Sequence, residues 1–588
     1  MREPQKILQA TRNGLTKLIS GAIIGKLLNF ICNTIIINSI GNKVLGTGSL
    51  RLDELLFMGP LVLTREGLRR AAYKININSK DSDINAKQSL INLTWFVAPI
   101  TVVVALVFAY INSAPAEIVC CDDTMLLART ERNIIYVLFG WSKCRDVTCE
   151  DTNVSISSYY RAMLYTFLAV LLAVLTEPVY VLAQSKLLTD LRANIETCAV
   201  LFKCLAMLYL TVGLGMDVEA YAIANIIYAS ISLCGYWGYM VYHKKFPRPK
   251  PFTTSSSTTQ WCTPAIQETA TVFWWQSIQK WLLENGAKGV LLWLGTATEQ
   301  GGYVIVSNLG SIVVRLLFQP VEEMSMAALG KLTSTTNKEK EKENEKNITD
   351  MVHRNFSGWL LLLVLIGLMF ACFGPCYSHL LLHLLYGTTW SATSAPVTLG
   401  WFCIYILFMA TNGVCEAFVQ GTSTPKKIKE YNLWMVFFTI VYFGVVMTLF
   451  PLFGAIGLVL ADIIKMLCRI SVCALKYIRP YFREERGKKT FTLTSLLPHT
   501  NVLLLFFGSL VFLQCTQYFM YMPAILLYTK NEMQTKTMLT RLYSVLFSKY
   551  VAAHVVCGIG CLVVTGRSIW KHHGKQLKEL RAKDKKMD

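Results

Sequence analysis

Long apolar runs separated by polar loops recur along almost the whole chain of 588 residues. A helix of about 20 apolar residues is long enough to cross a bilayer. The pattern therefore predicts an all-α polytopic membrane protein with about 14 transmembrane helices. The predicted spans are 16–40, 52–66, 89–111, 160–184, 193–213, 219–242, 277–296, 302–325, 356–384, 397–420, 431–450, 453–475, 497–528 and 543–566.

Charge and a proline interrupt one of these spans. From Arg315 to Glu323 the chain reads Arg-Leu-Leu-Phe-Gln-Pro-Val-Glu-Glu. A charge near the bilayer centre costs about 3 kcal/mol or more, so such residues face a protein interior or a watery cavity. The proline frees a backbone carbonyl that neighbouring helices or water must satisfy. The stretch predicts a many-helix bundle with a polar passage.

The formal net charge of +20 is a topology signal. With 14 spans and a cytosolic N-terminus, most of the 57 Lys and Arg fall in loops on the cytosolic side. This is the positive-inside pattern, and it predicts that both termini are cytosolic. It also argues against nucleic acid as a partner. We expect no cleavable signal, because the N-terminus lacks a compact apolar core.

Similar short sequences recur in the two halves in the same order, about 240 residues apart. Glu177 near the end of one span corresponds to Glu416, and Ala224-Asn-Ile-Ile227 corresponds to Ala461-Asp-Ile-Ile464. These matches predict two six-helix lobes of parallel repeat plus two C-terminal helices, an arrangement typical of transporters. The predicted parts are an N-lobe at 1–242 with a lumenal loop at 112–159, a cytosolic linker at 243–276, a C-lobe at 277–475, two helices within 476–566, and a basic cytosolic tail at 567–588.

Lys26, Lys288 and Arg315 lie well inside predicted spans and could converge on a cleft. Such a cluster suits an anionic headgroup such as a diphosphate, because Arg gives bidentate contacts and Lys a point charge. Interior ion pairs are the alternative, and snorkelling suits Arg161, Arg469 and Lys549 near span ends. Acidic candidates within spans are Glu177, Glu284, Glu322, Glu323, Glu416 and Asp462.

Two further charged stretches are candidates for substrate contact. Lys280, Glu284 and Lys288 are spaced so that they share one helical face, although a wholly cytosolic amphipathic helix is the alternative. Arg65 and Arg69 lie one turn apart at the cytosolic end of the second span. They are either ordinary anchors or a rim that contacts lipid phosphate.

The predicted lumenal loop carries oxidation and glycosylation candidates. Of the 18 cysteines, Cys120, Cys121, Cys144 and Cys149 share this loop. In an oxidising lumen they favour at least one disulfide, and three full pairings are open; zinc is the weaker alternative without a CxxC pair. Asn153-Val-Ser155 is a glycosylation acceptor in the same loop.

Enzyme motifs are missing from the sequence. It contains no Walker loop, no GxSxG and no HExxH. We therefore expect neither enzymatic activity nor a cofactor.

Several of these elements together resemble a known family. They are Thr64-Arg-Glu-Gly-Leu-Arg-Arg-Ala71, Thr176-Glu-Pro178, Lys280 to Lys288, Arg315 to Glu323, and Asn412-Gly-Val-Cys-Glu-Ala-Phe418. The chain resembles the oligosaccharidyl-lipid flippase family of the multidrug/oligosaccharidyl-lipid/polysaccharide exporter superfamily. It departs from the family at Asn38, where an Arg is expected, and its loops at 112–159 and 338–346 are longer than usual.

The resemblance implies a protein of the endoplasmic reticulum membrane. It implies movement of Man5GlcNAc2-PP-dolichol from the cytosolic to the lumenal face for N-glycosylation, with membrane lipid and this dolichyl-diphosphate oligosaccharide as partners. A dilysine pattern at Lys585 and Lys586 fits retrieval to the same membrane. Two alternatives stay open: a non-transporting accessory protein of dolichol-oligosaccharide assembly, and a drug or metabolite exporter.

Overall fold

The described part of the computed structural model is almost entirely helical. Its residues are 31–39, 42–74, 83–112, 156–185, 188–243, 247–253, 259–318, 321–322, 325–326, 329, 342–423, 425–486, 498–523 and 548–584. Contacts divide the chain into unit 1, Met1–Val304, and unit 2, Ile305–Asp588. This division falls after the predicted linker, and the predicted lobe boundaries remain a prediction.

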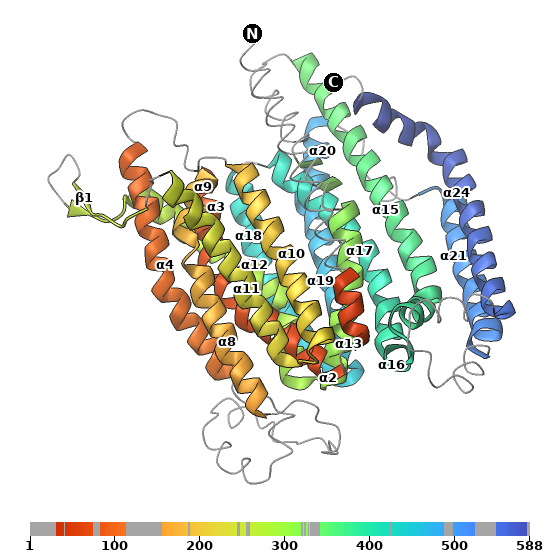
Figure 1. Ribbon diagram of the computed structural model, residues 1–588. Helices are drawn as coiled ribbons and strands as arrows, with labels where there is room; N and C mark the ends of the chain where they lie inside the picture. Colours follow the sequence, from red (N-terminus) through yellow and green to blue (C-terminus); the bar gives the residue numbers. More distant parts are fainter. Residues whose placement is uncertain are drawn as a thin grey trace. The chain divides into compact units, whose positions relative to one another are not determined.

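The described residues of unit 1 form a helix bundle and one short hairpin (Figure 1). Its helices are α2 (Asn42–Leu45), η1 (Gly46–Met58), α3 (Gly59–Lys74), α4 (Asp83–Ile111), α8 (Ile156–Val174), α9 (Glu177–Ser185), α10 (Thr189–Leu208), η3 (Tyr209–Gly213), α11 (Val218–Tyr242) and α12 (Pro264–Leu294). The hairpin pairs β1 (Phe252–Thr253) with β2 (Thr259–Gln260) in antiparallel register. Helix α13 (Ala297–Val313) runs across the division between the units.

Unit 2 is also a helix bundle. Its elements are η4 (Val314–Phe318), α15 (Lys342–Tyr386), α16 (Thr388–Ser391), α17 (Ala395–Thr422), α18 (Pro425–Phe453), α19 (Ala455–Val472), η5 (Cys473–Ile478), α20 (Arg479–Arg486), α21 (Thr500–Thr516), η7 (Gln517–Tyr521) and α24 (Lys549–Asp584). Helices α15 and α17 pack along each other, and α21 and α24 pack together and against α15. Gly454 adopts a φ of +59°, which lets the chain end α18 and begin α19 at once.

Nine helices in the described part are long and apolar enough to cross a membrane, which makes the chain a multi-pass membrane protein. They are Gln88–Ile111, Ser157–Val174, Asn194–Gly213, Val218–Tyr242, Val352–Tyr386, Ala395–Thr422, Lys427–Phe453, Thr500–Tyr521 and Lys549–Gly574. Each of them overlaps a span predicted from the sequence. The predicted spans 52–66, 277–296 and 453–475 are helical as well, but they carry several charged residues and are not among the nine.

The described parts of the segment predicted as a linker contain a short strand pair and the start of a helix. Helix α12 begins at Pro264, because proline is well suited to the first turn of a helix, whereas the predicted span begins at 277. The Asn92 side chain of α4 accepts from the backbone N–H of Lys250 at 2.9 Å. Its amide donates to the carbonyl oxygens of Lys250 and Trp261, each at 2.8 Å. The hairpin is therefore fastened to the end of α4 (Figure 1).

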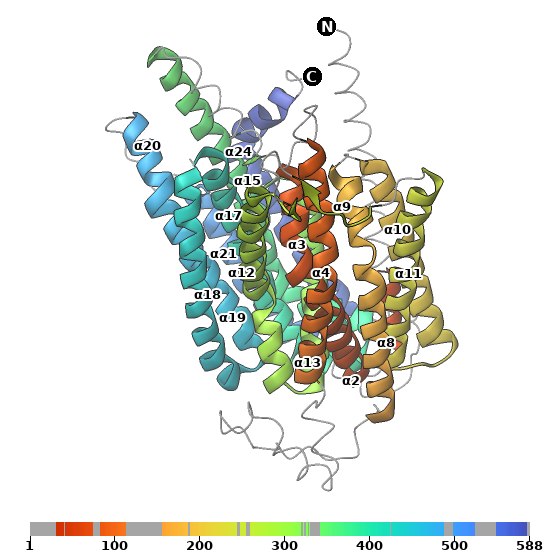
Figure 2. The same cartoon turned by 90° about the vertical axis from the view of Figure 1, so that its left-hand side faces the viewer.

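A glycine sets the close crossing of α3 and α12, which run side by side in unit 1 (Figure 2). A Cβ atom on Gly67 would lie 2.3 Å from the Cα atom of Trp274. Backbone atoms cannot yield as a flexible side chain can, so this crossing requires the missing side chain. The same α3 turn carries Arg65 and Arg69, and the crossing fixes the helix that presents them.

Candidate functional site

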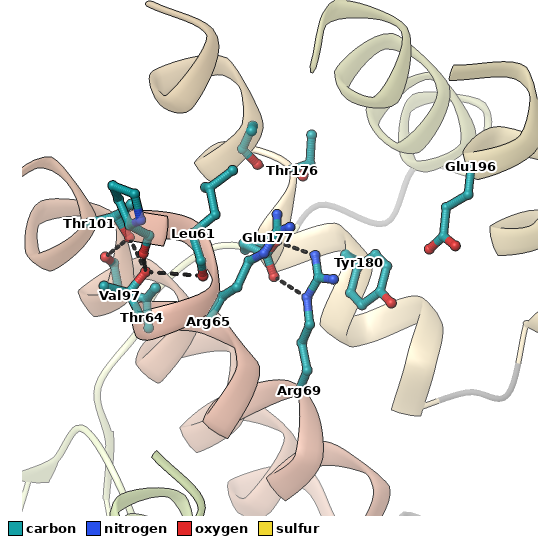
Figure 3. A network of polar contacts seen from close by, with 12 residues as sticks. Leu61, Thr64, Arg65, Arg69, Val97, Thr101, Thr176, Glu177, Tyr180 and Glu196 are labelled. Atoms are coloured by element: carbon teal, nitrogen blue, oxygen red, sulfur yellow. Dashed lines mark hydrogen bonds and ion pairs between the residues drawn. The ribbon is translucent and has the colours of Figure 1, made fainter. Parts of the chain in front are cut away.

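The first charged cluster of unit 1 joins α3 to α9, as Figure 3 shows. Arg65 Nη1 donates to Glu177 Oε1 at 3.1 Å, and Arg69 Nε donates to Glu177 Oε2 at 2.9 Å. Arg69 Nη2 also donates to Glu177 Oε1. The Glu177 side chain is 1% exposed, so two guanidinium groups hold one buried carboxylate. The predicted pair of arginines and the predicted glutamate thus meet in one network.

Local sequence explains why Glu177 points back toward α3. Helix α8 ends at Val174 and α9 begins at Glu177. Pro178 lacks a backbone N–H, so it is suited to a first helical turn and not to the interior of a continuous helix. The break re-aims the chain, and the acidic residue takes the first turn of α9, where the helix dipole favours a negative charge.

Tyr180 extends this network. The Arg69 guanidinium lies over the Tyr180 ring at 3.6 Å, and that of Arg192 lies over the ring at 4.5 Å. Arg192 Nη2 is 3.8 Å from Glu196, whose side chain is 44% exposed. Burial alone would lower the pKa of Arg69, but the charge and hydrogen bonds of Glu177 outweigh it, so that pKa lies above its ordinary value. The network is a charged brace between α3, α9 and α10.

A second cluster of unit 1 centres on η1, a π-helix. Lys203 Nζ of α10 donates to Asp53 Oδ1 at 2.7 Å. Lys288 Nζ of α12 lies 2.7 Å from Glu54 Oε2. Arg51 Nη2 donates to the carbonyl oxygen of Leu292 near the end of α12 at 3.0 Å. We name Arg51, Asp53, Glu54, Lys203 and Lys288 the deep charge cluster.

The position of the deep charge cluster within the membrane indicates the environment of its side chains. Lys203 lies at the middle of the candidate span Asn194–Gly213. The four side chains of the two ion pairs are 21 to 35% exposed. Charged side chains at such depth avoid lipid, so the exposed parts of these side chains are expected to face a water-filled cavity. Three cations against two carboxylates leave the deep charge cluster with a net positive charge, which favours an anionic ligand.

Unit 2 carries its own polar contacts along α17 and α19. Glu416 of α17 binds Arg469 of α19. Asn412 Nδ2 and Gln420 Nε2 donate to the Glu416 carboxylate at 3.4 and 3.3 Å. The expectation that Arg469 snorkels is wrong, because its side chain is 12% exposed and is held by Glu416. The Glu416 carboxylate on α17 binds the Arg469 guanidinium, so this side chain does not extend to the membrane surface for a partner.

A buried triad lies one turn earlier on α19. The Tyr442 hydroxyl donates to Asp462 Oδ1 at 2.9 Å, and Lys465 Nζ donates to the same oxygen. Lys465 Nζ also lies 4.2 Å from the centre of the Tyr442 ring. All of these groups lie inside unit 2, and they form an interior ion pair of the kind the sequence allowed.

Two stretches of the family resemblance meet in unit 2. A Cβ atom on Gly413 of α17 would lie 1.7 Å from Glu322 Oε1. The Glu322 carboxyl group therefore lies directly against α17 at Gly413, and a larger side chain there would have to displace it. Glu416 lies one turn further along the same helix. Gly413 thus lies beside Glu322, a contact between two distant stretches that sequence spacing did not reveal.

The remaining site predictions stand as follows. Lys280 and Glu284 have their backbones in α12, and Arg315 has its backbone in η4. Lys288 lies in unit 1 and Arg315 in unit 2, so the predicted convergence of Lys26, Lys288 and Arg315 stays a prediction. The predictions outside the described residues are Lys26, Glu323, Cys120, Cys121, Cys144, Cys149, Asn153, Lys585 and Lys586.

Sequence reasoning missed most of the deep charge cluster. It placed Arg51 outside the spans and gave Asp53 and Glu54 no role. Lys203 was recognisable as a lysine inside a predicted span, and that was the available signal. Among the described residues, no group of three or more His, Cys, Asp or Glu is placed to bind a metal ion.

Comparisons with known proteins extend these findings. A relative from Dictyostelium discoideum, named Man(5)GlcNAc(2)-PP-dolichol translocation protein RFT1, is 30% identical over 498 residues, covering 79% of this chain and 86% of the relative. The mouse protein of the same name is 26% identical over 479 residues, covering 79% and 81%. A solved structure of the lipid II flippase MurJ, inward closed, matches 94% of this chain and 98% of that chain.

The MurJ likeness has a TM-score of 0.56 at 9% identity, so it shows a shared transporter fold. The family model Rft-1, described as Rft protein, matches residues 10–122 and 134–580. These ranges cover most of the sequence and include both charged clusters of unit 1. The chain therefore belongs to the Rft protein family.

Proposed function

We propose that this protein translocates Man5GlcNAc2-PP-dolichol from the cytosolic to the lumenal face of the endoplasmic reticulum membrane for protein N-glycosylation. The names of its relatives support the substrate. The observation that carries the proposal is Lys203, a partly exposed cation at the middle of a membrane span. A lysine is retained at such depth where it meets water and an anionic ligand.

The substrate fits the chemistry of the deep charge cluster. A diphosphate carries several acceptor oxygens and more than one negative charge. Lys203 and Lys288 supply point charges to such a group, and they lie beside consecutive residues of one helix. Arg51 braces η1 against the end of α12 through the Leu292 carbonyl oxygen. In this proposal the cluster holds the diphosphate while the oligosaccharide crosses.

The other predicted site residues take supporting roles. Arg65, Arg69 and Glu177 brace the cytosolic end of unit 1. Contact with substrate stays a prediction for Lys26, Lys280, Glu284, Arg315, Glu322, Glu323 and Glu416.

The proposed architecture has 14 spans: two six-helix lobes and two C-terminal helices, with both termini cytosolic. The nine apolar helices among the described residues, together with the helices that overlap 52–66, 277–296 and 453–475, account for twelve of these spans. The lumenal loop at 112–159 would carry the disulfide and the glycan at Asn153. In this proposal the protein acts as a transporter and not as an enzyme, and the names of its relatives support the transporter role.

An exporter of drugs or metabolites is the less favoured function. Its cation site would need carboxylates available to the drug, whereas Asp53 and Glu54 are both held by lysines. An accessory role in dolichol-oligosaccharide assembly is the nearer alternative, since it would involve the same lipid-linked oligosaccharide.

Sealed microsomes from cells depleted of the protein test whether Man5GlcNAc2-PP-dolichol is its substrate. We expect Man5GlcNAc2-PP-dolichol to accumulate and to remain accessible to a membrane-impermeant α-mannosidase added outside. Re-expression of the intact chain should return the lipid to the protected, lumenal pool. An unchanged distribution of this lipid, with retention of a cationic dye in depleted cells, would instead favour the exporter.

A further inference from the structure

The deep charge cluster has an unusual internal arrangement. Each of its lysines comes from a different helix, and each is held at 2.7 Å by one carboxylate of η1. Asp53 and Glu54 are consecutive residues of this π-helix, and one pairs with α10 while the other pairs with α12. Single-turn π-helical segments occur frequently at functional sites, and this segment is longer.

We infer that the two carboxylates stand in for the diphosphate, and that they take up protons when a diphosphate takes their lysines. The inference rests on the proposed function and deepens it, because it specifies how substrate and protons compete for one site. The ion pairs lower the cost of keeping two lysines at this depth. Without a carboxylate partner, a lysine at this depth would bear most of the cost of a desolvated charge.

The exchange follows from the charges involved. A lysine ammonium group has three donors and no preference between a carboxylate and a phosphate oxygen other than charge and geometry. A diphosphate brings the larger negative charge, so it displaces a single carboxylate. The released carboxylate then lies near a second anion and has lost its cation. Both changes favour its protonated form, and the proton comes from water.

The groups around the carboxylates do not replace the lysines. Asp53 is faced by Lys203 and Cys204 of α10 and by Tyr221 of α11. A thiol and a phenol are neutral near pH 7, so they offer no second cation. Glu54 is faced by Lys288 of α12.

Arg51, on the same helix as both carboxylates, donates to the Leu292 carbonyl oxygen and is buried. Tyr159 of α8 lies beside Arg51. Diphosphate binding should therefore leave Asp53 and Glu54 without a replacement partner among these groups.

Linkage fixes the direction of the effect. If binding takes up protons, affinity for the diphosphate rises as pH falls. Each released carboxylate contributes up to about one proton per bound diphosphate. An account in which the ion pairs persist in the complex predicts no proton uptake by these residues.

Titration calorimetry of the purified full chain with geranyl diphosphate measures this uptake. Runs at one pH in buffers of different ionisation enthalpy give the number of protons bound per ligand.

The variants Asp53→Asn and Glu54→Gln, made separately, keep both lysines. We expect each to bind about tenfold more tightly than the intact chain, as removal of about 1.4 kcal/mol of competition implies, and to take up fewer protons. Proton uptake by the ligand itself cancels in these comparisons.

Asp217→Asn is the matched control, because Asp217 is an exposed acid of unit 1 outside the cluster. It should leave affinity and proton uptake unchanged.

Lys203→Met and Lys288→Met test the proposed binding site separately from the proposed exchange of carboxylate for diphosphate. Binding that is insensitive to both lysines contradicts the proposed site itself. Binding that needs the lysines, with the same proton uptake in Asp53→Asn and Glu54→Gln as in the intact chain, overturns the exchange and leaves the site standing. If one acid variant fails to fold, comparison of the other variant with the intact chain still shows whether the carboxylates take up protons.

Discussion

Replacement of Lys203 by methionine should lower the transport rate by about tenfold to a hundredfold, whereas Asp53→Asn should retain it. The reason is that a charge-assisted contact to a phosphate contributes about 1.5–3 kcal/mol, and a factor of ten corresponds to about 1.4 kcal/mol. Methionine keeps an unbranched apolar stem, one atom shorter than lysine, but has no charge. The rate is measured as movement of Man5GlcNAc2-PP-dolichol in sealed microsomes at matched protein abundance.

The pair of substitutions separates a binding cation from a structural ion pair. Lys203 and Asp53 are bonded to each other at 2.7 Å and are similarly exposed, so a purely structural pair would suffer equally from either change. Removal of one partner of this partly exposed pair leaves an uncompensated charge in both variants. Equal losses of rate in Lys203→Met and Asp53→Asn would contradict a direct role for the lysine.

Glu177→Gln should cost about 3–5 kcal/mol of stability, the largest loss expected from a single charge removal in unit 1. The carboxylate is 1% exposed and holds both Arg65 and Arg69. Glutamine has nearly the same shape but leaves two guanidinium groups without their counter-charge. The measurement is the thermal unfolding midpoint of the purified protein in one detergent.

Glu196→Gln is the matched control within the same network (Figure 3). Its side chain is 44% exposed and lies 3.8 Å from Arg192, and exposed pairs of this kind contribute about 0–1 kcal/mol. Its unfolding midpoint should stay close to that of the intact chain. Similar midpoints for both glutamine variants would show that Glu177 does not brace the helices.

Hydropathy and charge distribution were sufficient to predict the helical, multi-pass fold. They work because a bilayer requires long apolar helices, whatever the tertiary contacts are. Glu177 was also recognisable as an acidic residue within a span, and Arg65 and Arg69 as either ordinary anchors or a rim at a span end. Their meeting in one network was not, because it depends on the break at Pro178 and on the close helix crossing at Gly67.

The deep charge cluster was harder to foresee. Asp53 and Glu54 lie near the start of a predicted span, where acidic residues are unremarkable at a membrane surface. Only the π-helix and the lysines of α10 and α12 give them a role, and these lysines are about 150 and 234 residues away. Periodicity reports the faces of one helix and says nothing of which distant helix supplies a partner.

The most direct test of the account is transport by the pure protein in liposomes. Authentic Man5GlcNAc2-PP-dolichol is reconstituted with the intact chain, with the Lys203→Met variant at equal protein, or without protein. A membrane-impermeant α-mannosidase reports the lipid reaching the outer face. The account predicts that the intact chain clearly accelerates the movement of the lipid. The rate for the variant should be lower by at least about tenfold. A rate for the intact chain equal to that of protein-free liposomes would contradict it and favour the accessory role.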